Sequence, residues 1–185
     1  MEYEEIFAIL EKEISPARFA HIKGVIKAAV MLAKRYDGDE KRAAMAALLH
    51  DCCKEYSNSE LKKMLINAKD PLAKADFFEY KSLLHGPAGA ILAKKRFGID
   101  DKKILEAVRV HTTGKIGMNT LDKIVFLADY IEETRDFPGV EALRIKAKEN
   151  LDEAVLAGYN STIQLLLEQN RPIFEGTVSG RNDIL

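Results

Sequence analysis

The sequence contains no tryptophan and only two cysteines, which stand side by side at Cys52 and Cys53. Adjacent cysteines do not suit the disulfide framework of a small secreted protein. No apolar run approaches the roughly 18 residues that a membrane helix needs. The first residues, MEYEEIFAILEKE, are acidic and amphipathic and lack the features of a secretion signal. We therefore expect a cytoplasmic protein that does not bind a membrane.

The chain also lacks an excess of charge of either sign. Its 28 basic and 29 acidic residues leave a net charge of −1, so no overall field favours nucleic acid as a partner. The length of 185 residues and a hydrophobic share of 47% are typical of a soluble protein with one sizeable core. We expect residues 1–185 to form a single domain.

Apolar residues recur at helical spacing almost throughout, and alternating strand patterns are scarce. The sequence therefore predicts an all-α helical bundle. Ser15-Pro16 indicates a helix start, and Asp37-Gly38-Asp39 indicates an interruption. We place His85 just ahead of a helix that begins near Pro87, and we expect the tail over 171–185 to be irregular. The other helices are expected at 3–14, 16–36, 40–53, 60–68, 73–82, after Asp100 or Asp101, and at 121–133, 140–147 and 151–170.

Histidines and aspartates supply the candidate chemistry. The chain has only four histidines, His21, His50, His85 and His111. A lone histidine on a helix is more often structural than a ligand, but two aspartates in apolar segments favour a ligand role. Asp51 ends the apolar segment LLHD, and Asp129 lies inside the apolar segment FLADYI. A buried carboxylate is costly unless something compensates it, so these positions predict a bound cation. Nitrogen and carboxylate ligands suit iron, manganese or zinc.

The order H…HD…D, with two further histidines between, resembles the HD-domain phosphohydrolase superfamily. Within it, the chain is similar to the YqeK group, hydrolases that split diadenosine tetraphosphate symmetrically. The matching segments, which span about 18–135, are RFAHIKGV, LLHDCCKEY, LLHGPAGA, VRVHTTG and LDKIVFLADYIEETR. The last two specify the group. The departure is Glu133, where members often carry proline. Residues 140–185 would add C-terminal helices and a tail.

The resemblance implies roles by position. His21, His50, Asp51 and Asp129 match the metal ligands of the superfamily. His85 and His111 match positions that bind a second metal or contact phosphate. An all-helical iron enzyme with one or two ions, often a homodimer, is implied. The substrate would be diadenosine tetraphosphate or a related nucleotide, and the product ADP.

From this we expect a metal-activated water to attack the tetraphosphate bridge. Asp51 and Lys54 are the candidate catalytic residues. The candidate substrate contacts, which supply positive charge or polar groups to phosphate, are Lys54, His85, His111, Thr112, Thr113, Gly114, Lys115 and Arg135. Lys115 is nearly as well explained as a solvated loop lysine. Arg135 also suits a cation near a helix C-terminus.

Two other functions stay open on the sequence. One is a different HD-domain phosphohydrolase that acts on an alarmone or a deoxynucleotide. Alarmone hydrolases usually place two acidic residues shortly after the HD pair, where this chain has Lys54-Glu55. The other is a non-catalytic nucleotide-binding helical module that keeps a metal for stability.

Overall fold

The computed structural model of the chain describes residues 1–74 and 76–185. These residues form helices and contain no strand, which confirms the predicted fold class. The helices are α1 (Tyr3–Glu13), α2 (Pro16–Arg35), α3 (Glu40–Leu49), α4 (Asn58–Asn67), α5 (Lys81–Phe97), α6 (Lys102–Val110), α7 (Thr120–Ile131), α8 (Val140–Glu149), α9 (Leu151–Glu168) and α10 (Glu175–Asp183), with short 3₁₀ helices at Pro71–Lys74 and Asp76–Glu79.

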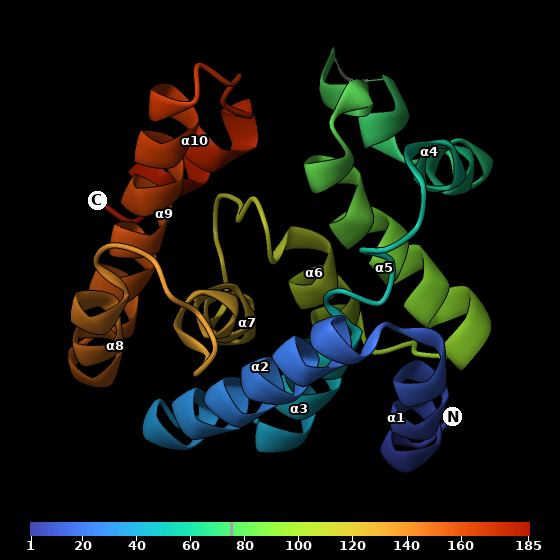
Figure 1. Cartoon of the computed structure of the whole chain (residues 1–185), viewed down its shortest axis with the longest axis horizontal. Helices are drawn as coiled ribbons and strands as arrows, with labels where there is room; N and C mark the ends of the chain where they lie inside the picture. The colour runs from blue at the N-terminus through green and yellow to red at the C-terminus, as the bar shows by residue number, and fades with distance from the viewer. Residues whose placement is uncertain (75) are drawn as a thin grey trace.

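Helices α2, α3, α6 and α7 pack against one another in the middle of the molecule (Figure 1). The C-terminal helices α8, α9 and α10 lie on one side, and α1, α4 and α5 lie on the other. The apolar stripes of the central helices meet in the core, where Ile22, Ala47 and Val125 are fully buried. Alanines on α3 allow the close helix contacts that the sequence predicts.

Helix α2 begins as predicted, because Ser15 caps it and Pro16 occupies its first turn. Helix α3, in contrast, is shorter than predicted and ends at Leu49 instead of continuing to Cys53. The His50 ring nitrogen Nδ1 lies 2.6 Å from the Ala47 carbonyl oxygen, and Cys52 N donates to Leu49 O at 3.2 Å. These bonds satisfy carbonyls of the last turn and release the chain from the helix at the HD pair.

Helix α5 begins at Lys81, so the prediction of a start near Pro87 is wrong and His85 lies inside the helix. Proline usually drives the preceding residue out of the helical conformation by a clash with its Cβ. Here the preceding residue is Gly86, which has no Cβ. A Cβ at Gly86 would also lie 2.6 Å from the Arg109 carbonyl oxygen of α6. The glycine therefore permits both a proline inside α5 and close packing of α5 on α6.

Two further expectations are corrected. Two short 3₁₀ helices occupy most of the segment 73–82, where one helix was predicted. Residue 75 of that segment lies outside the described residues. The tail is not irregular throughout, because residues Glu175–Asp183 form α10 and pack on α9. Two glycines weaken the helical signal of this segment by about 1 kcal/mol each relative to alanine.

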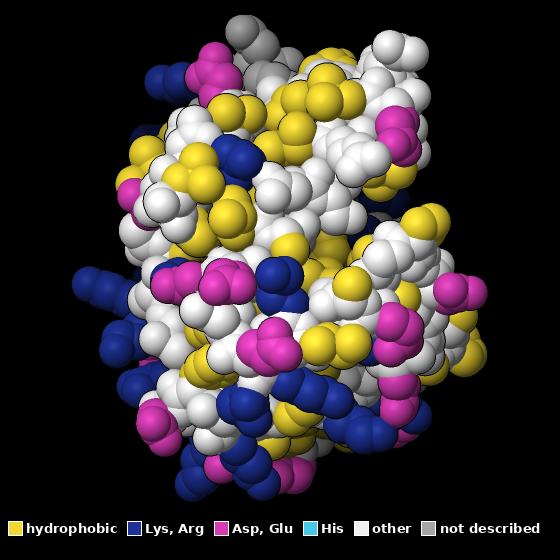
Figure 2. Space-filling model, turned by 90° about the vertical axis from the view of Figure 1, so that its left-hand side faces the viewer, with side chains coloured by type: hydrophobic (Ala, Val, Ile, Leu, Met, Phe, Trp, Pro, Cys, Tyr) yellow, Lys and Arg dark blue, Asp and Glu magenta, His cyan; other side chains and the backbone are white. Residues whose placement is uncertain are grey.

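The face formed by the C-terminal helices is shown in Figure 2. Hydrophobic side chains gather over its upper part, and lysine and arginine side chains gather at its lower end. Ile145 of α8 and Leu165 and Leu167 of α9 are at least half exposed. Across residues 1–74 and 76–185, no helix has the length and apolar character that a membrane span requires.

Candidate metal centre and active site

The fold brings all four histidines and both candidate aspartates to one place between the central helices. His21 comes from α2, His85 from α5 and Asp129 from α7. His50 and His111 are the C-cap residues of α3 and α6, and Asp51 follows His50 directly. His50 keeps a helical backbone conformation, and Asp51 lies in the turn that follows α3.

His21, His50 and Asp51 form the first group of potential ligand atoms, which lie within 4.8 Å of one another. His21 Nε2 is 3.8 Å from Asp51 Oδ2, and His50 Nε2 is 3.7 Å from the same oxygen. Asp129 Oδ1 joins this group at 3.1 Å from His21 Nε2. The four residues that match the superfamily's ligands therefore surround one space.

Asp51, His85 and His111 form a second group with the same spacing. Asp51 Oδ1 lies 3.3 Å from His85 Nε2 and 3.6 Å from His111 Nε2. The two histidine Nε2 atoms are 3.0 Å apart. Asp51 thus turns one carboxylate oxygen to each group, an arrangement with places for one or two cations.

The outer nitrogens of two histidines fix their tautomers. His50 Nδ1 lies 2.6 Å from the Ala47 carbonyl oxygen, and His111 Nδ1 lies 2.7 Å from the Val108 carbonyl oxygen. A carbonyl oxygen only accepts, so each Nδ1 carries the proton and each Nε2 keeps a lone pair. Metal-binding histidines are usually held in this way by their other ring nitrogen.

Unpartnered polar atoms test whether this donor set fits a cation. Among the described residues, His21 Nε2, His50 Nε2 and Asp51 Oδ1 are buried and have no hydrogen-bond partner. A buried polar atom without a partner is costly, and these three are of the types that coordinate metals. The residues fit a divalent cation, which the orphaned atoms would coordinate.

The protonation states suit the same role. Burial lowers the pKa of His50 and of His85 to about 4, so both are neutral at pH 7. Burial also opposes ionisation of Asp51, but the neighbouring His50, His111, His85 and Lys54 together hold its pKa well below the usual value. Neutral imidazoles and ionised carboxylates are the forms that bind metal.

His21 and Asp129 lie side by side in the first group, and each shifts the pKa of the other. Burial lowers the pKa of His21, but Asp129 and Glu132 outweigh that effect and raise it overall. Burial opposes ionisation of Asp129, and His21, His50 and Arg135 nevertheless lower its pKa. Glu132 Oε1 lies 3.1 Å from His21 Nδ1, so a carboxylate orients this ring from behind.

Lys54 and Thr112 lie beside the second group. Lys54 Nζ is 3.0 Å from His85 Nε2 and 3.6 Å from Asp51 Oδ1. Thr112 Oγ1 is 3.1 Å from His85 Nε2 and 3.0 Å from His111 Nε2. These two candidate residues therefore reach the centre with an ammonium and a hydroxyl.

Two arginines contact the aspartates. Arg135, a predicted substrate contact, donates from Nη2 to Asp129 Oδ1 and from Nε to the Asp129 carbonyl oxygen at 2.7 Å. Arg18 donates from Nη1 to Asp51 Oδ2 at 2.8 Å. Arg18 was not among the predicted site residues, although its position three residues before His21 places both on the same face of α2.

The loop after His111 only partly follows the prediction. Thr113 lines the cavity described next, but Gly114 and Lys115 do not reach the two histidine groups. Lys115 Nζ lies 3.0 Å from Glu106 Oε1 and 3.6 Å from Asp122 Oδ2, so its charge is balanced there. Gly114 has φ of +60°, and a Cβ would lie 1.7 Å from the Tyr159 hydroxyl. Gly114 therefore shapes the loop.

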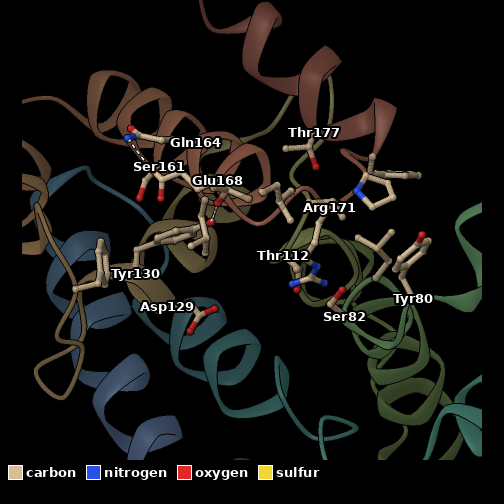
Figure 3. Close-up of a pocket in the computed structure, with 18 of the residues that line it drawn as sticks. Tyr80, Ser82, Thr112, Asp129, Tyr130, Ser161, Gln164, Glu168, Arg171 and Thr177 are labelled. Carbon is tan, nitrogen blue, oxygen red and sulfur yellow. Dashed lines mark hydrogen bonds between the residues drawn. The ribbon is translucent and has the colours of Figure 1, made fainter.

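A cavity of about 580 Å³ opens beside Asp129 and Thr112 (Figure 3). We call it cavity A; residues that line it include Thr112, Asp129, Tyr130, Arg135, Leu165 and Arg171. Ser82 of α5 lies on one side and Glu168 of α9 on the other, and Arg171 points into the cavity. Arg171 lies in the tail that the sequence left without a role, so only the packing of α9 could identify it.

A second hollow, of about 550 Å³, opens on the His21 side of the centre. We call it hollow B; residues that line it include Ala17, Arg18, His21, Glu132, Arg135 and Phe137. Arg135 and Phe137 line both spaces, so they stand between cavity A and hollow B. The candidate metal centre is thus accessible from two directions.

The sequence of the chain matches those of known proteins. Residues 18–134 match the HD domain family. The chain is 38% identical over 178 residues to a protein of Halalkalibacterium halodurans named bis(5'-nucleosyl)-tetraphosphatase, symmetrical, which covers 96% of this chain and 94% of that protein. A Bacillus subtilis protein of the same name is 36% identical over 177 residues, covering 96% of this chain and 94% of its own.

A solved structure shows the same fold. It is the crystal structure of a protein from Clostridium acetobutylicum described as a predicted HD superfamily hydrolase involved in NAD metabolism. That protein is 37% identical to this chain, superimposes with a TM-score of 0.95, and is matched over 100% of this chain and 97% of its own.

Proposed function

We infer the function of this chain from one premise: the chain belongs to the HD domain family. We propose that it is a metal-dependent hydrolase that splits diadenosine tetraphosphate symmetrically into two molecules of ADP. Two relatives that align with nearly the whole chain carry the name of that activity. The carrying observation in the structure is Asp51, whose two carboxylate oxygens face two groups of histidines beside a cavity large enough for a nucleotide.

The family and the donor set both indicate a divalent metal. His21, His50, Asp51 and Asp129 would hold one ion, and Asp51, His85 and His111 would hold a second. We propose iron as the metal, with manganese and zinc as the alternatives that suit the same ligands. When bound, such an ion lowers the pKa of a water toward about 7 and polarises a phosphoryl oxygen.

The side chains around the centre have separate tasks. Asp51 orients the attacking water by accepting its hydrogen bond at Oδ1. Lys54 lies 3.6 Å from that oxygen and donates to the phosphoryl group as negative charge develops on it. Water adds to one inner phosphorus and loses a proton through Asp51 to solvent, the bond from that phosphorus to the central bridging oxygen breaks, and the other ADP leaves. Because this negative charge develops beside the carboxylates of the centre, cations must lie close to it.

Other residues bind and orient the polyphosphate. Thr112 offers its hydroxyl, and Arg135 offers a guanidinium at the boundary of cavity A. His85 and His111 contact phosphate if only the first metal is present. Thr113 contributes to the wall of cavity A, while Gly114 and Lys115 hold the loop in place.

We propose that residues 1–185 act as one unit, because cavity A needs both Asp129 of the HD core and Leu165 of α9. A homodimer is proposed through the exposed apolar side chains of α8 and α9. A nucleotide partner, rather than nucleic acid or membrane, agrees with the net charge of −1. A cytoplasmic location agrees with a nucleotide substrate.

A product assay tests the proposed function against its alternatives. The metal-loaded protein is incubated separately with diadenosine tetraphosphate, guanosine tetraphosphate and a deoxynucleoside monophosphate. We expect ADP as the sole nucleotide product from the first and no turnover of the others. Turnover of the monophosphate alone would reject the proposal, and turnover of none would favour a binding module.

A further inference from the structure

Hollow B and cavity A reach the candidate metal centre past different residues. His21, whose Nε2 is buried without a hydrogen-bond partner among the described residues, lies in its wall. Cavity A instead reaches the centre through Asp129 and Thr112. A ligand that extends through the centre would therefore place one end in each space.

Hollow B carries the features of a phosphate site. Arg18 and Arg135 line it with side chains that are 30% and 38% exposed, so both guanidiniums are accessible to a ligand. Ser15 and Ala17, at the start of the 20-residue helix α2, also line it. A helix N-terminus and arginine side chains both favour anions.

Three acidic residues also line hollow B, and two of them accept hydrogen bonds from neighbouring residues. Glu55 accepts hydrogen bonds from the backbone and hydroxyl of Ser15. The Glu132 side chain is fully buried and accepts from Thr134 N at 2.7 Å. Asp136 is the remaining acidic residue of the lining and is exposed at its rim. Arg18 and Arg135 are the basic side chains of this lining, and each pairs with an aspartate, Asp51 or Asp129, whose charge a bound cation would balance.

Cavity A has a different character. Its walls include Leu165, Leu166 and Phe174, which suit a nucleobase. In hollow B, Phe137 is the large apolar side chain among mainly charged and polar ones. The two spaces therefore differ in what they can recognise, although the two halves of diadenosine tetraphosphate are chemically identical.

We propose that hollow B is the subsite for the second half of a dinucleoside polyphosphate: it binds the phosphates through Arg18, Arg135 and the first turn of α2. Cavity A holds the nucleoside of the first half. This inference rests on the proposed function. The inference adds to the proposed function that the two halves are bound differently. The base of the first half is recognised in cavity A, and the second nucleoside is held through its phosphates.

Charge reversal at the rim of hollow B tests this. Ala17 is exposed, and an acidic residue in the first turn of α2 is compatible with the helix dipole. Ala17→Gln matches the size of Ala17→Glu without its charge. Met31→Glu adds the same charge about 21 Å further along α2, beyond the screening length at physiological salt. The assay measures kcat and KM for diadenosine tetraphosphate and the Kd of ADP on metal-loaded protein.

We expect Ala17→Glu to raise KM for diadenosine tetraphosphate about 3- to 10-fold at physiological salt, because the added carboxylate repels the second half. The Kd of ADP, which fills cavity A first, should change less than about twofold. Met31→Glu should resemble the wild type, and Ala17→Gln, which adds the same bulk without the charge, should raise KM less than Ala17→Glu does.

Three results bear against the inference. An unchanged KM in Ala17→Glu, or an equal rise in the Kd of ADP, would show that hollow B does not hold the second half. An equal rise in KM in Met31→Glu would assign the effect to overall charge. Absence of wild-type turnover would instead reject the proposed function, and it would be seen before any variant is compared.

Discussion

The carboxylate behind His21 offers the sharpest test of how this chain prepares its centre. Glu132 Oε1 lies 3.1 Å from His21 Nδ1 and accepts from Thr134 Oγ1 at 2.6 Å, while Oε2 accepts from Thr134 N at 2.7 Å. Replacing Glu132 by Gln keeps the size of the side chain. It turns one accepting oxygen into a donor that must face a ring N–H or a backbone N–H.

The magnitude follows from those contacts. One buried donor is left unpaired, which costs about 1–3 kcal/mol of stability. His21 also loses the negative charge that makes its Nε2 a stronger ligand, and changes of this kind typically weaken metal binding about 10- to 100-fold. We therefore expect Glu132→Gln to bind Fe²⁺ or Mn²⁺ about 10- to 100-fold more weakly, with a small fall in Tm.

Chelator competition under anaerobic conditions measures this affinity directly. Glu133→Gln is the matched control, because this substitution makes the same chemical change one residue later. The Glu133 side chain is 63% exposed beside Lys27. Equal metal affinity in Glu132→Gln and the wild type would refute the reasoning. Equal weakening in both variants would assign the effect to net charge and not to the contact with His21.

Three further predictions follow from the site and the loop beside it. Asp51→Asn should lower turnover of diadenosine tetraphosphate by at least about 100-fold, with the helical circular dichroism spectrum retained; near-normal turnover would place the chemistry elsewhere. Gly114→Ala should destabilise the protein by about 2–5 kcal/mol in urea unfolding, because φ is +60° and the new Cβ meets a buried hydroxyl; an unchanged midpoint would contradict the loop geometry. The metal-free protein should lose stability as pH falls from about 6.5 to 4, since the pKa of His50 and of His85 lies near 4 in the folded chain and near 6.5 in the unfolded chain. Each histidine contributes about 3 kcal/mol of stability, which is fully present above pH 6.5 and is lost as pH falls to 4. A free energy of unfolding that stays constant across this window would show that these rings are not buried as neutral groups.

Residue patterns alone predicted much of the fold. Helical spacing and capping residues predicted α2 closely, and unpaired acidic residues in apolar segments predicted the cluster around Asp51. The start of α5 was misread because proline usually begins a helix, and the effect of Gly86 depends on its contact with α6. A local signal could not supply that contact.

The residues missed or misplaced depended on distant packing. Lys115 was expected near phosphate, but Glu106 and Asp122 come from other elements and hold it. Arg171 enters cavity A only because α9 packs on α7 and turns the tail back over the site. Such contacts between segments far apart in the chain cannot be read from periodicity.

The central claim is that cation binding at the Asp51 cluster produces symmetrical hydrolysis. Its most direct test strips the protein with a chelator, restores metal in steps, and measures ADP formed from diadenosine tetraphosphate against metal bound per chain. The account predicts no ADP from the stripped protein and a rate that rises with bound metal. Full ADP formation by the metal-free protein would contradict it.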